Sequence, residues 1–98
     1  MTAQVAADLR AAAEVLRRDG WTQGDYEKAD GCKCLSGALR SVCGGIDSTE
    51  PERYLPAWGY LRALIGREAI TWNDAPGRTA DEVIAALEAA ADAAEADR

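Results

Sequence analysis

The sequence predicts a single all-α domain, folded as a compact bundle of about four helices. Alanine is the most frequent residue and outnumbers the β-branched residues, and it favours helices more than any other residue. In several segments the large apolar side chains recur at steps of three and four, which places them on one face of a helix. A chain of 98 residues is long enough for one hydrophobic core and too short for two, so residues 1–98 are expected to fold as one unit.

The two ends of the chain carry the clearest helical patterns. Over residues 2–18 the apolar positions repeat at steps of four and three, and Gly20 follows as a residue that commonly ends a helix. A second long helix is predicted over residues 80–95, because Thr79 and Glu82 have the spacing of a capping box. Its last turns are rich in alanine, so they are expected to fray or to pack closely against another helix, in this chain or in a second copy.

Two further helices are predicted in the middle of the chain. Residues 33–43 have one apolar face and are followed by two glycines. Residues 50–66 begin with the proline and acidic residues of a helix start and continue with an apolar face. Pro56 cannot donate its helical hydrogen bond, so we expect this helix to break near Pro56. Residues 20–32 show no helical period and contain turn-forming Gly and Asp, which predicts a long loop.

Residues 70–79 are predicted to form an ordered corner. The alternate positions of Ile70 and Trp72 fit a short extended segment, interpreted as coil, whose two side chains reach the core. Pro76 and Gly77 fit the two central positions of a type II turn, after which the last helix begins. The corner is therefore expected to be rigid.

The polar residues of this corner have a structural and a functional interpretation. In the structural one, Trp72 anchors the corner and Arg78 pairs with a carboxylate such as Asp74 or Asp81. In the functional one, the rigid loop presents Asn73, Asp74 and Arg78 together to a ligand. The candidate binding residues are Trp72, Asn73, Asp74, Arg78 and Thr79.

Charge and hydropathy exclude several classes of partner. The formal net charge of −6 opposes binding to nucleic acid, which needs clustered Lys and Arg. No run approaches the ~18 apolar residues of a membrane span, and Asp8 interrupts the stretch where a signal peptide would be apolar. We therefore expect an acidic cytoplasmic protein with neither nucleic acid nor membrane as its partner. Arg greatly outnumbers Lys, which is typical of a GC-rich genome.

The three cysteines raise the question of a metal or a reactive thiol. Zinc at Cys32, Cys34 and Cys43 is disfavoured, because the chain has no His and the spacing of the cysteines is unusual. We expect no cofactor. Cys34 precedes a helix, where the helix dipole and Lys33 would favour its thiolate, yet the usual His partner of a catalytic thiol is absent. An enzyme is therefore less expected than a binding protein.

Three short motifs occur in order along the chain. They are GWTQG at residues 20–24, CLSGAL at 34–39 and WNDAPGRT at 72–79, the last followed by Glu82 and Val83. In this combination the chain resembles an uncharacterised small-domain family found in actinobacteria and their phages. The resemblance covers nearly the whole chain and implies a source, while it implies no activity.

Two functional hypotheses follow. The leading one is a non-enzymatic protein-interaction module with another protein as its partner, because a chain of this size leaves little room for a deep catalytic pocket. Its expected contact patch consists of Tyr26, Tyr54, Trp58 and Tyr60. The alternative is a small thiol-dependent enzyme or ligand-binding domain centred on Cys34, with Asn73, Asp74 and Arg78. A homodimer through the Ala-rich C-terminal helix is compatible with either hypothesis.

Overall fold

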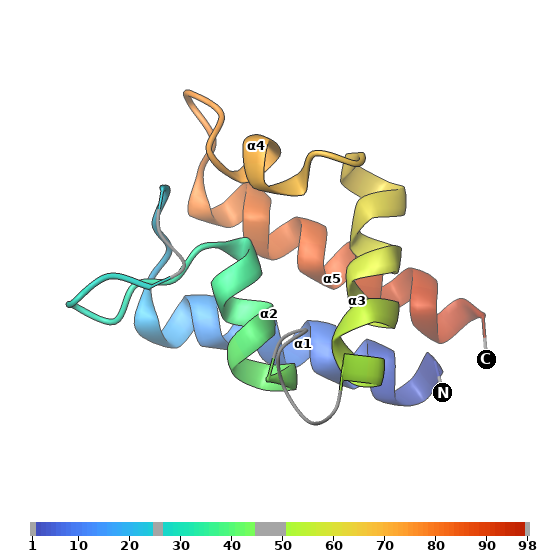
Figure 1. Cartoon of the computed structure of the whole chain (residues 1–98). Helices are drawn as coiled ribbons and strands as arrows, with labels where there is room; N and C mark the ends of the chain where they lie inside the picture. The colour runs from blue at the N-terminus through green and yellow to red at the C-terminus, as the bar shows by residue number, and fades with distance from the viewer. Residues whose placement is uncertain (1, 25–26, 45–50, 98) are drawn as a thin grey trace.

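The two longest helices come from the two ends of the chain and lie side by side (Figure 1). In the computed structural model, residues 2–24, 27–44 and 51–97 are described. These residues contain five helices and no strand, which confirms the predicted all-α fold. The helices are α1 (Thr2–Asp19), α2 (Leu35–Cys43), α3 (Pro51–Ile65), α4 (Ala69–Asn73) and α5 (Ala80–Ala96). None of the helices in the described part of the chain is both long and apolar enough to cross a membrane.

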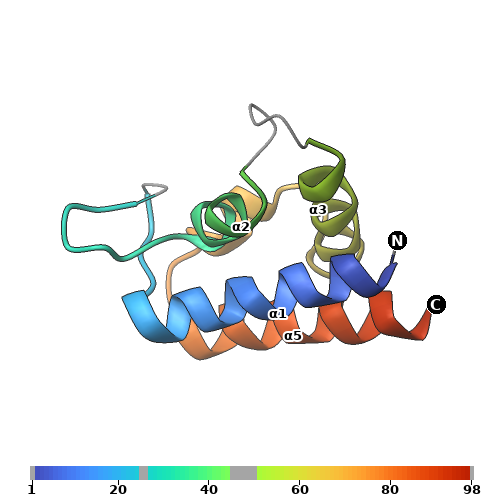
Figure 2. The ribbon, with the colours of Figure 1, turned by 90° about the horizontal axis from the view of Figure 1, so that it is seen from below.

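The antiparallel pair α1 and α5 forms one layer, and the three other helices lie on one side of it (Figure 2). The core between the layers contains Leu9 from α1, Leu39 from α2, Leu61 from α3 and Leu87 from α5, each fully buried. Because their hydrophobic faces meet, the two layers enclose a single core cluster.

The Ala-rich end of α5 packs closely against other helices of its own chain. Ala90, Ala91 and Ala94 are buried, so of the two outcomes expected for these turns, fraying or close packing, the structure has close packing. Ion pairs flank the contact between the helices, with Arg10 of α1 reaching Asp92 and Glu95 of α5. Because these alanines are already covered, a homodimer through α5 would have to use the opposite, exposed face of the helix.

The predicted break near Pro56 is wrong, because α3 continues through this residue to Ile65. The side chain of Pro56 is exposed, so its ring does not disturb the core, and the missing hydrogen bond lies early in the helix. The inner face of α3 carries Tyr54, Ala57 and Leu61, all buried against the other helices. Packing of this face on both sides of Pro56 outweighs the loss of one backbone hydrogen bond.

The prediction of coil at the start of the corner is also wrong, because residues 69–73 form the short helix α4. Its turns close through bonds from the Trp72 amide to the Glu68 carbonyl (2.8 Å) and from the Asp74 amide to the Ile70 carbonyl (3.0 Å). The helical spacing turns Ala69 and Asn73 inward. Ile70 is 51% exposed, so the expectation that its side chain reaches the core is wrong.

The two ends of the predicted loop 20–32 lie side by side, because Lys33, directly after the loop, bonds to residues at its start. The Thr22 amide donates to the Lys33 carbonyl (3.0 Å), and the Lys33 amide donates to the Gly20 carbonyl (2.9 Å). These two bonds hold the start of the loop beside the start of α2. The helix itself begins at Leu35, two residues later than predicted, because Cys34 has extended backbone and acts as its N-cap.

Candidate functional site

Asn73, at the end of α4, joins three distant parts of the chain. Its amide oxygen Oδ1 accepts hydrogen bonds from Trp21 Nε1 (2.7 Å) and from the Leu35 amide (3.0 Å). Its Nδ2 donates to the Thr22 carbonyl (3.3 Å) and to Asp74 Oδ1 (2.9 Å). The side chain is 1% exposed, so these bonds are made in the protein interior. Asn73 therefore holds other residues in place and has no amide group left for a ligand.

Gln23 and Gly24 complete the connection between the loop and the corner. Gln23 Nε2 donates to the carbonyls of Asn73 and Ala75, both at 3.0 Å. The Gly24 amide donates to Asp74 Oδ1 (3.1 Å). Residues of all three sequence motifs thus meet at one place in the structure. The role of Gln23 is not predicted from the sequence, although its position in the first motif is a signal.

The second half of the corner has the predicted turn and helix start. Gly77 has φ of +83° and the Arg78 amide donates to the Ala75 carbonyl (3.1 Å), as a type II turn requires. The Thr79 hydroxyl accepts from the Glu82 amide, and the Glu82 carboxylate accepts from the Thr79 amide. The capping box is therefore confirmed.

Arg78 has partners other than those predicted. Its guanidinium carbon lies 4.0 Å from the centre of the Trp72 ring, and its Nε donates to the Trp72 carbonyl (2.9 Å). Its acidic partner is Glu82 at 3.5 Å, so Arg78 pairs with a carboxylate as expected, but with Glu82 instead of Asp74 or Asp81. One helical turn separates Arg78 from Glu82, whereas Asp74 is held by Gly24 and Asn73. Arg78 thus fastens the corner.

A pocket of about 370 Å³ opens beside Asn73, between α2, α3 and α4. Four of its lining residues, Cys34, Ser36, Ala69 and Asn73, are buried. The half-buried Trp58 and the exposed Ile70 supply its large apolar side chains. The residues that line it are Gly24, Cys34, Ser36, Trp58, Ala69, Ile70, Asn73 and Asp74.

The polar groups of these buried lining residues are occupied by the protein itself. Cys34 Sγ accepts a hydrogen bond from the Gly37 amide (3.3 Å), and the Ser36 hydroxyl bonds to the Tyr54 hydroxyl (3.2 Å). Burial raises the pKa of the Cys34 thiol, and the negative charge of Asp74 raises it further. The thiol is therefore protonated near neutral pH, in contrast to the predicted effect of the helix dipole and Lys33. Lys33 instead pairs with Asp19 at 3.0 Å.

The pocket joins three of the four residues proposed for a ligand site. Cys34, Asn73 and Asp74 line it, whereas Arg78 does not. Asp74 Oδ1 is bonded to Gly24 and Asn73, while no residue that the structure describes donates to Asp74 Oδ2. Among the described lining residues, Asp74 carries the only formal charge.

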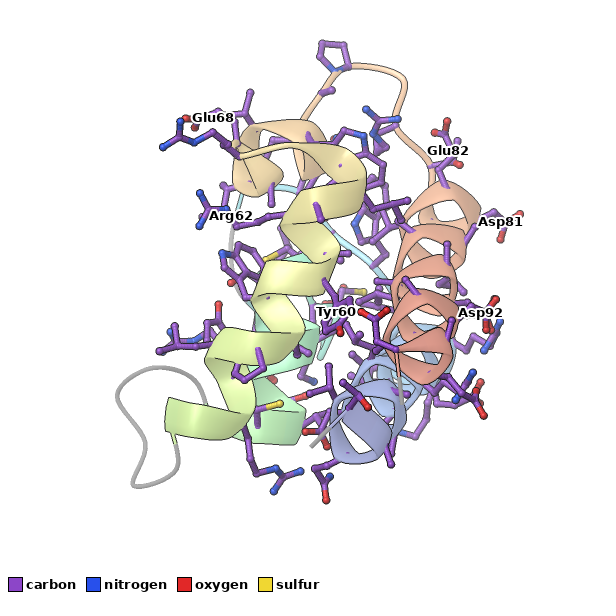
Figure 3. The ribbon with its side chains drawn as sticks, turned by 90° about the vertical axis from the view of Figure 1, so that its right-hand side faces the viewer. Tyr60, Arg62, Glu68, Asp81, Glu82 and Asp92 are labelled. Carbon is purple, nitrogen blue, oxygen red and sulfur yellow. The ribbon has the colours of Figure 1, made fainter. Side chains whose placement is uncertain are left out.

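The predicted aromatic patch does not form one exposed surface. Tyr54 is buried, with 6% exposure, and stacks on Trp58 with 5.7 Å between ring centres. Tyr60 lies on the side of α3 that faces α5 (Figure 3), where its hydroxyl donates to Asp97 Oδ2 (2.6 Å). Tyr26 lies outside the described residues. The structure describes three residues of the proposed patch, and Trp58 is the one of these that lines the pocket.

The three cysteines are free and occupy different surroundings. Cys34 and Cys43 are buried, and Cys32 is half-buried with its sulfur near Gly20. Burial, together with the nearby Asp8 carboxylate, raises the pKa of Cys43 to about 12. Within residues 2–24, 27–44 and 51–97, no group of three acidic or Cys side chains is arranged to hold a metal ion.

Fold and site together define a small all-α domain whose pocket is lined by residues of α2, α3 and α4 and by residues of the segments that flank α2 and α4. The chain belongs to the family of unknown function DUF6197, which it matches over residues 1–93. This match confirms the expectation that the chain resembles an uncharacterised family over nearly its whole length. No curated protein matches the chain, and no solved structure matches it.

Proposed function

We propose that the protein is a non-enzymatic protein-interaction module that binds its partner at the pocket between α2, α3 and α4. One observation carries this proposal: in the described part of the chain, the large apolar side chains left exposed are Leu55, Leu64 and Ile70. All three belong to α3 or α4, and Ile70 also lines the pocket. Exposed apolar residues, one of which lines a concave site, are typical of a protein contact surface.

The alternative hypothesis names a thiol-dependent enzyme or a ligand-binding domain centred on Cys34, and the enzyme receives less support. A catalytic thiol needs a low pKa or a base that removes its proton, whereas burial raises the pKa of Cys34. Its sulfur already accepts the Gly37 amide as the helix cap of α2. Arg78, the proposed cationic member of the catalytic set, is engaged by Trp72 and Glu82. These contacts favour binding over covalent chemistry at this pocket.

We also propose a source and a location for this module. The three ordered motifs and the excess of Arg over Lys support an accessory protein of an actinobacterium or one of its phages. Free thiols at Cys32, Cys34 and Cys43 support a reducing compartment such as the cytoplasm.

Affinity capture from an actinobacterial lysate tests the module and its surface together. The variant Ile70→Asp places a charge at the pocket wall, and Ala85→Asp places the same charge on the exposed face of α5. The wild type and Ala85→Asp are expected to retain the same protein, and Ile70→Asp is expected to lose it. Equal capture by all three proteins, or no specific capture by the wild type, would contradict the proposal.

A further inference from the structure

Within its described lining, the pocket presents one negative charge, that of Asp74. Asp74 Oδ1 is held by the Gly24 amide (3.1 Å) and by Asn73 Nδ2 (2.9 Å). These two bonds fix the plane of the carboxylate and leave Oδ2 without a donor from any described residue. A carboxylate oxygen of this kind binds cationic N–H donors more strongly than neutral ones.

The other polar groups of the pocket give little to a ligand. Asn73 has all its amide positions engaged, and Ser36 and Cys34 bond to Tyr54 and Gly37. No Lys or Arg of the described chain lines the pocket, so an anion would find the Asp74 charge and no cation to offset it.

The charged residues of the turn between α3 and α4 do not line the pocket. Arg62 and Glu68 lie on the same side of this turn (Figure 3), and Arg67 lies next to Glu68 in the sequence. All three are exposed and carry a net charge of about +1, and none of them is a lining residue, so Asp74 remains the charge within the described lining. The Arg78 guanidinium lies over Trp72 and is not directed into the pocket.

The pocket walls suit an apolar chain that ends in a positive charge. The Trp58 ring and the Ile70 side chain offer apolar surface, and an aromatic ring also attracts a cation near its face. A volume of about 370 Å³ lies near the lower end of the ~300–1,000 Å³ typical of small-ligand sites. It is large enough for one long side chain and too small for a folded segment.

We infer that the pocket binds a lysine or arginine side chain of the partner protein, with its charged end at Asp74 and its methylene groups against Trp58 and Ile70. This inference rests on the proposed function, since it names the chemistry by which the module recognises its partner. It assigns Asp74 as the residue that selects for positive charge, and Trp58 and Ile70 as the residues that hold the apolar stem.

Titration of the isotope-labelled full chain by NMR tests the chemistry with defined probes. The probes are N-acetyl-lysine amide and N-acetyl-arginine amide, with N-acetyl-norleucine amide as a neutral analogue and N-acetyl-glutamate amide as an anion. The basic probes are expected to shift the Gly24 and Asp74 amides and the Trp58 indole. Their affinity should exceed that of norleucine by about threefold or more, because the norleucine analogue lacks the charge that pairs with Asp74.

Two variants with the same chemical change locate the charge effect. Asp74→Asn keeps an oxygen that can accept from Gly24 and Asn73 but removes the charge. Asp81→Asn makes the same change on an exposed residue of α5. Asp74→Asn should reduce binding of the basic probes to the level of norleucine, whereas Asp81→Asn should leave it unchanged. The inference fails if norleucine or glutamate binds as well as lysine, or if Asp74→Asn retains the preference.

Failure of this inference is distinguishable from failure of the proposed function. If Ile70→Asp loses the captured protein while Asp74→Asn keeps it, the protein-interaction module is supported, and the inference that its pocket binds a lysine or arginine side chain is wrong. If the basic probes bind through Asp74 but no protein is captured, the pocket chemistry stands and the protein-interaction proposal is wrong. In that case the ligand is a small organic cation.

Discussion

Trp21 Nε1 donates a hydrogen bond of 2.7 Å to the side-chain oxygen of Asn73, which lies 52 residues later in the chain. The same oxygen accepts the Leu35 amide, so one buried atom connects the end of α1, the start of α2 and the end of α4. Asp74, the charged residue of the pocket, follows Asn73 directly and shares its hydrogen-bond network. The position of the proposed ligand-binding carboxylate therefore depends on an amide whose hydrogen-bonding groups are all engaged within the protein.

Replacing Asn73 is expected to destabilise the protein strongly. Asn73→Ala leaves Trp21 Nε1 and the Leu35 amide without their acceptor, and each unsatisfied buried group costs about 1–3 kcal/mol. We expect the free energy of unfolding to fall by about 2–4 kcal/mol, as measured by urea denaturation. Thr71→Ala, an exposed change on the same helix, is the control and should stay within about 0.5 kcal/mol of the wild type. A loss below about 1 kcal/mol for Asn73→Ala would show that the network is not essential.

The local elements of the corner were predictable from sequence, and the role of Asn73 was not. The type II turn and the capping box at Thr79 depend on residues within four positions of one another, so local rules identify them. Asn73 bonds instead to Trp21 and Leu35, and their proximity is created by packing of the helices. Local rules therefore identify Asn73 only as a candidate binding residue of the corner.

The two errors in the helix predictions have the same cause. Pro56 and the alternation of Ile70 with Trp72 were judged by local preference, as a helix break and an extended segment. In the folded protein, Tyr54 and Leu61 are buried on either side of Pro56, and Ala69 and Asn73 are buried four residues apart. Packing of these inner faces decides both segments in favour of helix, since tertiary contacts outweigh a local preference of this size.

The pocket was partly foreseen. The alternative hypothesis groups the Cys34 thiol with Asn73, Asp74 and Arg78 of the corner, and the pocket brings together all of these except Arg78. The place of Trp58 and Ile70 in its wall depends on how α3 and α4 cross α2. Spacing along the chain contains no information about that crossing.

Gly20 and Cys32 are predicted to be coupled through close contact. Gly20 has φ of +96°, and a Cβ built there would lie 2.7 Å from Cys32 Sγ. Gly77 also has positive φ, at +83°, but nothing lies within 4 Å of such a Cβ. Gly77→Ala should cost about 1 kcal/mol from backbone strain alone, and Gly20→Ala should cost more because the sulfur must also move.

Gly20→Ala is expected to lose more stability than Gly77→Ala. Adding Cys32→Ala to Gly20→Ala should restore this extra loss, because it removes the sulfur that meets the new Cβ. Thermal unfolding of Gly20→Ala, Cys32→Ala and the variant that combines both changes gives the coupling energy between the two positions. This energy is expected to be at least about 0.5 kcal/mol. Strictly additive effects of Gly20→Ala and Cys32→Ala would mean that the contact has no energetic consequence.

The helix cap at Thr79 is predicted to make a modest contribution to stability, and two variants distinguish the effect of its hydroxyl from that of its methyl group. Thr79→Ala removes the hydroxyl that accepts the Glu82 amide, a change that typically costs about 1 kcal/mol. Thr79→Ser retains the hydroxyl and should restore most of that loss in the same denaturation experiment. If serine behaves like alanine, the methyl group of Thr79 rather than the cap stabilises the corner.

Cys43 is predicted to make the fold sensitive to alkaline pH. Its pKa rises from an ordinary value of 9.0 to about 12 in the folded protein, because burial and the Asp8 carboxylate disfavour the thiolate. Between pH 9 and pH 12 the unfolded chain has lost this proton while the folded chain retains it, so the unfolded state binds fewer protons. The stabilising effect is therefore complete below pH 9 and is lost as the pH rises toward 12.

Urea denaturation at pH 8, 9, 10 and 11 measures this effect by comparing the wild type with Cys43→Ala. The other titrating side chains are common to both proteins, so the difference between their slopes reports Cys43. The wild type should lose stability more steeply above pH 9, by up to about 1.4 kcal/mol per pH unit for one thiol. The advantage of the wild type over Cys43→Ala should accordingly narrow as the pH rises. Parallel pH profiles would show that the Cys43 thiol ionises equally easily in the folded and unfolded chain.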